Sequence, residues 1–298
     1  MILISVNNKI DLSTLTGGTF NSLFPRDNIK TPVLSKSART TSITSFTLTA
    51  TLPSNHNIGC VAIAGHNLSR TATFRVKTYF VEYSGNTVVS TTLENDSGNL
   101  SAWYYLASDD LYWSNGDTFS ASIASQDRID KSNSTAVYYL PTNTKASKVE
   151  ITFTDTDNQD GYIEIGRVFI GEVINPQYNV EYGDLSYGLK DLSKISLGDN
   201  GIKYARNYPI LRTVVFNWKD LGLGEGITAY RAQYELGLTG EVVTTYSLPT
   251  YADISGTKTP DSNWFIQAFL GNFAELDKLT YPYYNRHGAG ISIEEVAR

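Results

Sequence analysis

The sequence of 298 residues contains one cysteine and three histidines. Cys60 lies in the apolar stretch "IGCVAIAG", and without a second thiol neither a disulfide framework nor a cysteine-rich zinc site can form. His56, His66 and His287 each stand beside asparagine or glycine, and no H-E-x-x-H spacing occurs. We therefore expect no bound metal and no cofactor.

Charged residues are also scarce, at 18% of the chain, and 24 lysines and arginines face 30 aspartates and glutamates. The resulting formal charge of -6 argues against a nucleic-acid partner or an anionic membrane surface. No apolar run approaches the roughly 18 residues of a membrane span. The first residues, "MILISVNNKIDLSTLTGG", lack the basic segment and the apolar stretch of a signal peptide. We expect synthesis in the cytoplasm and no membrane insertion.

Tyrosine is abundant, with 20 copies, and serine and threonine are frequent, which favours strands. Apolar and polar residues alternate in "SFTLTATL" (45–52), "TATFRVKTYF" (71–80) and "KVEITFTD" (148–155). This period of two is typical of a strand with one buried face. The sequence therefore predicts a mainly β protein.

The segment "GYIEIGRVFIG" (161–171) has three glycines five residues apart, yet it does not match G-x-G-x-x-G, and no P-loop or G-x-S-x-G motif occurs elsewhere. Strict alternation would place Arg167 on the apolar face. A β-bulge at Gly166 would instead turn the neighbouring isoleucines and Val168 toward the core and leave Arg167 outside. We expect Gly161 at a hairpin tip and Gly171 where the strand leaves the sandwich.

The preceding "DTDNQDG" (155–161) contains three aspartates before a glycine. An EF-hand loop places its glycine sixth and a glutamate twelfth, whereas here, counted from Asp155, Gly161 is the seventh residue and the twelfth is Gly166 instead of a glutamate. We interpret the segment as a solvated hairpin turn and not as a calcium loop.

Glycines and prolines punctuate residues 1–35, which predicts an extended N-terminal arm. A change in character near residue 174 divides a β-sandwich domain, 36–174, from a C-terminal β-rich domain, 175–298. In the latter, Ile227, Tyr230 and Tyr234 recur at helical spacing, so we expect one helix over about 223–237.

The segment "WYYLASDDLYWSNGDTF" (103–119) gathers aromatic rings around aspartates. Such a composition suits a glycan site, where rings stack on sugars and carboxylates take hydroxyls, and equally a protein interface or core. A pair such as Asp109 and Asp110 would also suit a glycosidase, if the two flanked a cleft. The candidate ligand or partner contacts are Trp103, Tyr105, Asp109, Tyr112 and Trp113.

The stretches "VAIAGHNLSRTATFRV", "GYIEIGRVFIGEVINPQYNVEYG" and "YYNRHGAGISIEEV" resemble a group of tailed-bacteriophage virion proteins. In that group a galactose-binding-like β-sandwich precedes a smaller C-terminal domain. The resemblance implies a non-enzymatic structural part of the virion tail, at the tail tip or baseplate, contacting other tail proteins and copies of itself. Residues 179–218 are similar in style to distal tail and tail-tube proteins, whose strands close rings through edge pairing. The group offers no catalytic residues.

The expected fold is thus a jelly-roll or galactose-binding-like β-sandwich followed by a smaller β-rich domain with one helix. The expected function is assembly through protein–protein contacts. The alternative is a carbohydrate-binding module that attaches a particle to a host surface glycan through residues 103–119.

Overall fold

The computed structural model describes residues 2–43, 45–84, 87–103, 135–178, 180–181, 183–197, 203–246, 251–252, 258–259, 268–283 and 286–297. Among these residues the chain is mainly antiparallel β-structure with one α-helix, which confirms the expected fold class. The segment 104–134, with most of the aromatic loop, lies outside the described residues.

The chain forms two compact units. The first contains residues 1–173 and 243–269, and the second contains residues 174–242 and 270–297. The division after Val173 falls beside the boundary expected near residue 174. The first unit also takes a later segment of the chain, which the linear division into 36–174 and 175–298 did not include.

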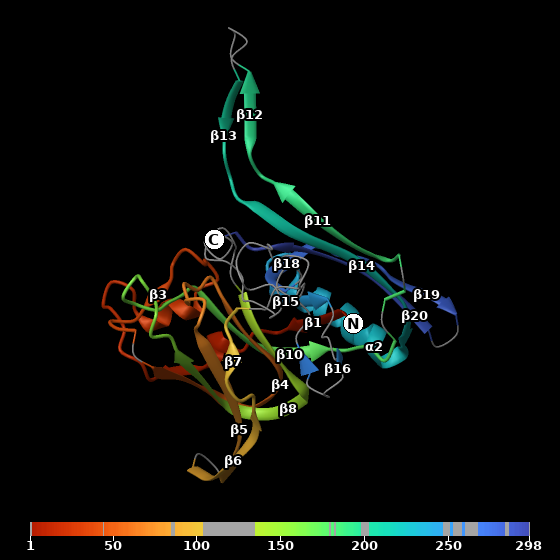
Figure 1. Ribbon diagram of the computed structural model, residues 1–298. Coiled ribbons are helices and arrows are strands. Elements are labelled where there is room, and N and C mark those ends of the chain that lie inside the picture. The colour runs from red at the N-terminus through yellow and green to blue at the C-terminus, as the bar shows by residue number, and fades with distance from the viewer. Residues whose placement is uncertain are drawn as a thin grey trace. The chain divides into compact units, whose positions relative to one another are not determined.

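In the first unit, the strand order is β15-β1-β10-β4-β8-β5-β6, and β2 and β7 pair with β4 and β5 (Figure 1). Its elements are β1 (Ile2–Val6), η1 (Ile10–Leu12), β2 (Thr14–Thr16), η2 (Arg26–Lys30), β3 (Ala38–Arg39), β4 (Phe46–Ala64), β5 (Thr73–Ser84), β6 (Thr87–Asp96), β7 (Leu100–Ser101), β8 (Thr135–Thr154), β9 (Glu164–Ile165), β10 (Arg167–Ile174), β15 (Glu241–Tyr246), β16 (Tyr251–Ala252) and β17 (Lys258–Thr259).

Strand β4 changes its core-facing register along its length. Leu48, Ala50 and Leu52 lie in the core, as the alternation in 45–52 predicts, whereas further along Val61 and Ile63 do so. Register shifts against β8, between Thr51 and His56 and between Ile58 and Cys60, accommodate this change. A bulge offsets the side-chain alternation by one residue, so both halves of the long strand serve the same core.

The N-terminal residues do not form the expected extended arm. β1 pairs with β15, and β2 pairs with β4. Ile2, Ile4, Ile10 and Ile29 are fully buried. These apolar side chains explain why the segment packs on the unit in spite of its glycines and prolines, since their burial outweighs the flexibility of the backbone.

The strand break at Gly166 brings Ile163, Ile165, Val168 and Ile170 into one core cluster, as the bulge hypothesis predicts. Gly166 is required by close approach, because a Cβ there would lie 3.0 Å from two backbone carbonyl oxygens. The other two glycine assignments differ. β8 and β9 do not pair, so Gly161 is not a hairpin tip, and Gly171 lies inside β10.

The expected outward position of Arg167 is wrong, because its side chain is buried. Its guanidinium donates to both carboxylate oxygens of Asp11, at 2.7 and 2.9 Å, and to the carbonyl of Ile29 at 3.3 Å. The N-terminal residues 11 and 29 thus supply an anion and a carbonyl that make burial of the cation tolerable.

The second unit is a four-stranded antiparallel sheet in the order β11-β14-β20-β18, with β19 also paired to β20 and the helix packed against β14 and β20. Its elements are β11 (Leu185–Asp191), β12 (Lys194–Leu197), β13 (Lys203–Arg206), β14 (Ile210–Gly222), α2 (Leu223–Leu236), β18 (Phe269–Glu275), β19 (Leu279–Tyr283) and β20 (Arg286–Glu295).

Helix α2 begins and ends close to the expected residues 223 and 237. At its start, the Glu225 carboxylate accepts the N–H of Gly222 at 2.8 Å. At its end, Gly237 has a φ of 57°, a conformation that favours glycine, and its N–H bonds to the Gln233 carbonyl. The buried face is not the expected one, because Ile227, Tyr230 and Tyr234 are exposed.

The ion pair between Arg167 and Asp11 gives a stability prediction. Replacing Asp11 with asparagine removes the charge that compensates the buried guanidinium, so the free energy of unfolding should fall by about 2 kcal/mol. We place the value below that of a fully buried pair because the Asp11 side chain is half exposed. Urea unfolding measures the change, and Asp27→Asn, which removes the same charge from an exposed position, should leave stability nearly unchanged. Equal stability of the two variants would contradict this role of Asp11.

Candidate functional site

Of the candidate glycan contacts, only Trp103 lies among the described residues, and it is part of the core. Its side chain is 4% exposed. The indole N–H donates to the Leu68 carbonyl at 2.8 Å, and the ring packs edge-on against His66. The expected role of Trp103 as a surface contact is therefore wrong. Tyr105, Asp109, Tyr112 and Trp113 lie outside the described residues.

The segment 155–161 is tied to the loop after β4 by a buried carboxylate. Asp155 accepts hydrogen bonds from the Ser69 backbone N–H, the Ser69 hydroxyl and the Asn158 amide. It is 1% exposed, so the expected solvated hairpin turn is wrong at this residue. With three donors satisfying it, Asp155 serves to join two turns.

Cys60 is the one thiol of the chain and therefore the obvious candidate nucleophile. It is fully buried in β4. Burial raises the pKa of the thiol from 9.0 to about 12, against the smaller opposite effect of hydrogen bonds with Ser5 and Tyr139. Since the thiolate is the reactive species, Cys60 is unsuited to nucleophilic catalysis.

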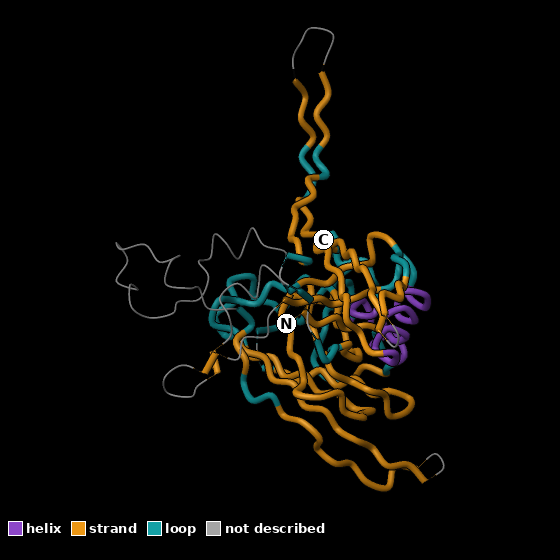
Figure 2. Tube along the Cα trace, turned by 90° about the vertical axis from the view of Figure 1, so that its right-hand side faces the viewer, coloured by secondary structure: helices purple, strands orange, loops and turns teal. Residues whose placement is uncertain are grey.

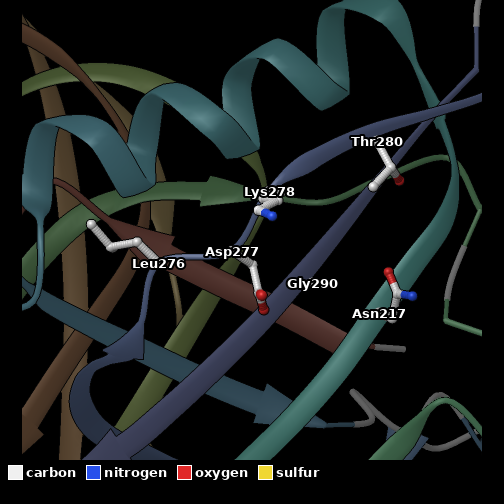
Figure 3. Close-up of a pocket in the computed structure, with 6 residues that line it drawn as sticks. All are labelled: Asn217, Leu276, Asp277, Lys278, Thr280 and Gly290. Carbon is white, nitrogen blue, oxygen red and sulfur yellow. The ribbon is translucent and has the colours of Figure 1, made fainter.

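A hollow of about 430 Å³ opens in the second unit (Figure 3). Asp277 points toward Gly290, where a Cβ would lie 2.5 Å from the carboxylate, and its backbone N–H donates to Gln233 of α2. Because the lining contains a single carboxylate, it lacks the pair that glycoside hydrolysis needs. The lining residues are Asn217, Leu276, Asp277, Lys278, Thr280 and Gly290.

Exposed apolar side chains of the second unit also lie on a feature that we name the ribbon, residues 192–209. It contains β12 and β13, which pair only with each other among the described strands and extend from the ends of β11 and β14 (Figures 1 and 2). Ile195 and Tyr204 are 71% and 56% exposed, and Tyr208 is also exposed. The ribbon is therefore a candidate interaction surface.

Two ion pairs brace the base of the ribbon. Arg212 of β14 binds Glu295 of β20 through its guanidinium and through its backbone N–H. Lys190 of β11 binds Glu294 at 2.7 Å. Glu295 is buried, so the Arg212 contact is shielded from salt, whereas the Lys190 pair is more exposed and contributes less. The ribbon thus extends from a fixed base.

The strands predicted from alternation do not include residues 192–209, although a local hairpin signal exists there. "SKISLGDNGIKYAR" has a short alternating segment on each side of "GDNG", and Asn-Gly is a strong hairpin signal. What the pattern cannot show is that β12 and β13 join no larger sheet among the strands that the structure describes.

In the described part of the chain, no group of three histidine, cysteine, aspartate or glutamate side chains comes together in a way that could hold a metal ion. Likewise, no helix in the described ranges is both long and apolar enough to cross a membrane.

No protein-family model matches the sequence, and no curated protein matches it. Solved structures match a little more than half of the chain. The lectin domain of Lectinolysin complexed with Lewis B antigen is 10% identical, with 56% of this chain and 98% of that chain covered and a TM-score of 0.33. The family 32 carbohydrate-binding module of Clostridium perfringens NanJ, in complex with galactose, is 10% identical, with coverages of 57% and 99% and a TM-score of 0.34.

A fucose-binding module of Streptococcus pneumoniae is likewise 10% identical, with coverages of 56% and 96% and a TM-score of 0.33. These three are lectin or carbohydrate-binding domains, and none is named as a bacteriophage protein. The likeness does not assign a ligand to this chain.

The burial of Cys60 predicts its reactivity. At pH 9 an exposed thiol is about half ionised, whereas the raised pKa keeps Cys60 protonated in the folded protein. A thiol-specific chromogenic reagent should therefore react with the native protein at least ~100-fold more slowly than with the urea-unfolded chain. Rapid, stoichiometric reaction of the native protein would show that Cys60 is accessible.

Proposed function

We propose that this protein is a non-enzymatic structural component of a bacteriophage tail that assembles through protein–protein contacts. The observation that carries the assembly function is the ribbon, whose apolar side chains are exposed although its base is fixed. The tail assignment rests on the sequence resemblance in residues 40–298, and it implies a place in the virion beside other tail proteins.

β12 and β13 form a two-stranded hairpin that has no third strand among the described residues. Such a hairpin is marginal unless a third strand or another surface covers it. The β12 and β13 strands bury little, since Ile195 and Tyr204 remain exposed, and Lys194, Ser196, Lys203, Ala205 and Arg206 are exposed as well. Burial of these side chains against a neighbouring protein would remove apolar area from water and provide a driving force for assembly.

Free strand edges give the ribbon a second means of attachment. β12 and β13 each pair on one side only among the described strands. Unpaired edge N–H and C=O groups can pair with a strand of another chain, and most proteins protect such edges against unwanted pairing. A ribbon with two open edges therefore fits a protein that is built to join others.

Removal of the ribbon tests this function. Asp191 and Ile210 lie opposite each other in the β11–β14 register, so residues 192–209 can be replaced by Asn-Gly, which suits a two-residue hairpin turn. We expect the shortened chain to remain folded by circular dichroism but to lose self-association or incorporation into particles. Sedimentation velocity of the purified protein and imaging of assembled particles measure the two outcomes. Normal assembly of the shortened chain would contradict the proposal.

Glycan binding is the second candidate function. Its support is the composition of residues 103–119, in which tyrosines and tryptophans stand among aspartates. The ligands named for the solved domains above, Lewis B antigen and galactose, are also glycans.

A pair of variants separates this candidate from assembly. Under glycan binding, Trp113→Ala together with Tyr105→Ala should lower affinity for a surface glycan at least ~10-fold, because stacking area is lost, while assembly is retained. Trp103→Phe is the matched control, since Trp103 is buried and should not affect binding. Glycan-array binding and particle assembly are both measured. Loss of assembly with no glycan bound by the wild type would exclude this candidate.

A further inference from the structure

We propose that the ribbon of one copy binds the exposed apolar face of α2 in a second copy of this chain. This inference rests on the proposed assembly function and names the surface that receives the ribbon. It predicts a head-to-tail contact, in which each copy donates one ribbon and offers one helix face.

The receiving surface is an apolar stripe along the full length of α2. It consists of Leu223, Ile227, Tyr230, Tyr234 and Leu238, just past the helix end. All five side chains are exposed, by 44% to 79%. Residues spaced by three and four share one helix face, so the stripe is continuous. A helix normally turns such a face toward its own core, and here it faces outward.

Close packing on the opposite face prevents α2 from turning the stripe inward. The helix residues against the sheet are small or polar. Gly226 packs against His287 of β20, and a Cβ added at Gly226 would lie 2.7 Å from the Cβ of His287. Gln233 accepts the backbone N–H of Asp277 at 2.9 Å. If the helix rotated, a larger stripe residue would have to take the place of Gly226, where it would not fit. The rotation would also break the hydrogen bond of Gln233. Packing of α2 on the sheet therefore keeps the stripe exposed.

The ribbon offers matching apolar chemistry. Ile195 of β12 lies opposite Ala205, and Tyr204 of β13 lies opposite Ser196, so the two apolar side chains project from opposite faces of the ribbon. Leu189 and Ile210 at the base are 75% and 57% exposed. On either face, an exposed apolar side chain of this kind is stabilised when another apolar surface covers it. Within the second unit, the α2 stripe is likewise an apolar surface that is exposed to solvent.

Charge favours a second copy as the partner. In the described residues of β12 and β13, every charged side chain is a cation, namely Lys194, Lys203 and Arg206. Residues 192–209 hold three of the 24 cations and one of the 30 anions, which leaves the rest of the chain with a formal charge of -8. A basic ribbon is thus attracted to the acidic remainder of another copy. Glu235 lies next to the stripe as an anion, and Arg231 as a cation.

Geometry excludes contact with the stripe of the same copy. The ribbon leaves the sheet at Ile210, the first residue of β14, and α2 follows Gly222, the last. The 13 residues of β14 span about 40 Å at a rise of about 3.3 Å per residue. The ribbon then runs further away from α2, as Figures 1 and 2 both show. A contact between unlike surfaces of two copies is heterologous, so it closes a ring or extends a filament.

Cross-linking tests the contact directly. One pool of full-length protein carries Ile195→Cys and a second carries Tyr234→Cys, while native Cys60 remains buried. After mixing, a short bis-maleimide should link the two pools into dimers. The matched control is Thr228→Cys, which is exposed on α2 but about 100° around the helix from Ile227. Equal linking of the two helix variants, or none with Tyr234→Cys, would overturn the proposal.

Affinity provides an independent measurement. Tyr230→Glu should raise the dissociation constant of self-association by at least ~10-fold, because it places a charge in the apolar contact, whereas Thr228→Glu should not. Arg231→Glu should strengthen association, since it removes the cation beside the stripe. Self-association that depends on residues 192–209 but ignores Tyr230→Glu would overturn the α2 contact and leave the assembly function standing. Self-association that ignores both changes would overturn the contact and the assembly function together.

Discussion

The pairing of β4 with β8 is the constraint on which the first unit depends. Both strands are long, and β4 also pairs with β2 and β10 along the edge opposite β8. The core-facing side chains of β4 are even-numbered up to Ile58 and odd-numbered from Val61, and the register shift between Ile58 and Cys60 accommodates this change. The strand break at Gly166, between β9 and β10, has the same effect, because it places Ile165 and Val168 in one core. Bulges thus allow a simple alternating sequence to wrap around a core.

The buried cation shows how the N-terminal residues became part of that unit. Arg167 follows the break at Gly166, and its charge is compensated by Asp11 and the Ile29 carbonyl. A buried ion pair of this type specifies a partner more than it adds stability. It ties a segment that is far away in sequence to β10, while the buried isoleucines of the same segment supply the apolar driving force.

In the second unit, packing density controls what remains exposed. Gly226 allows α2 to approach β20 at His287, and this close contact fixes the rotation of the helix. The aromatic and aliphatic side chains of α2 are left on the outer face as a consequence. The ribbon also leaves apolar side chains exposed, because its base is held by Arg212 and Glu295 while β12 and β13 pair with no further strand in the part of the chain that the structure describes. The ribbon and the outer face of α2, two surfaces that the unit leaves exposed, are the physical basis of the assembly that we propose.

The sequence by itself determined the mainly β class, the strands at 45–52 and 148–155, the core set around Gly166 and the existence of one helix near 223–237. These features follow from local periodicity and glycine placement, which act over a few residues. Only the tertiary structure decided that Arg167 is buried, that Trp103 belongs to the core and that the helix exposes Tyr230 and Tyr234. Each of these depends on a partner distant in sequence, namely Asp11, Leu68 or His287, and no local pattern encodes such a contact.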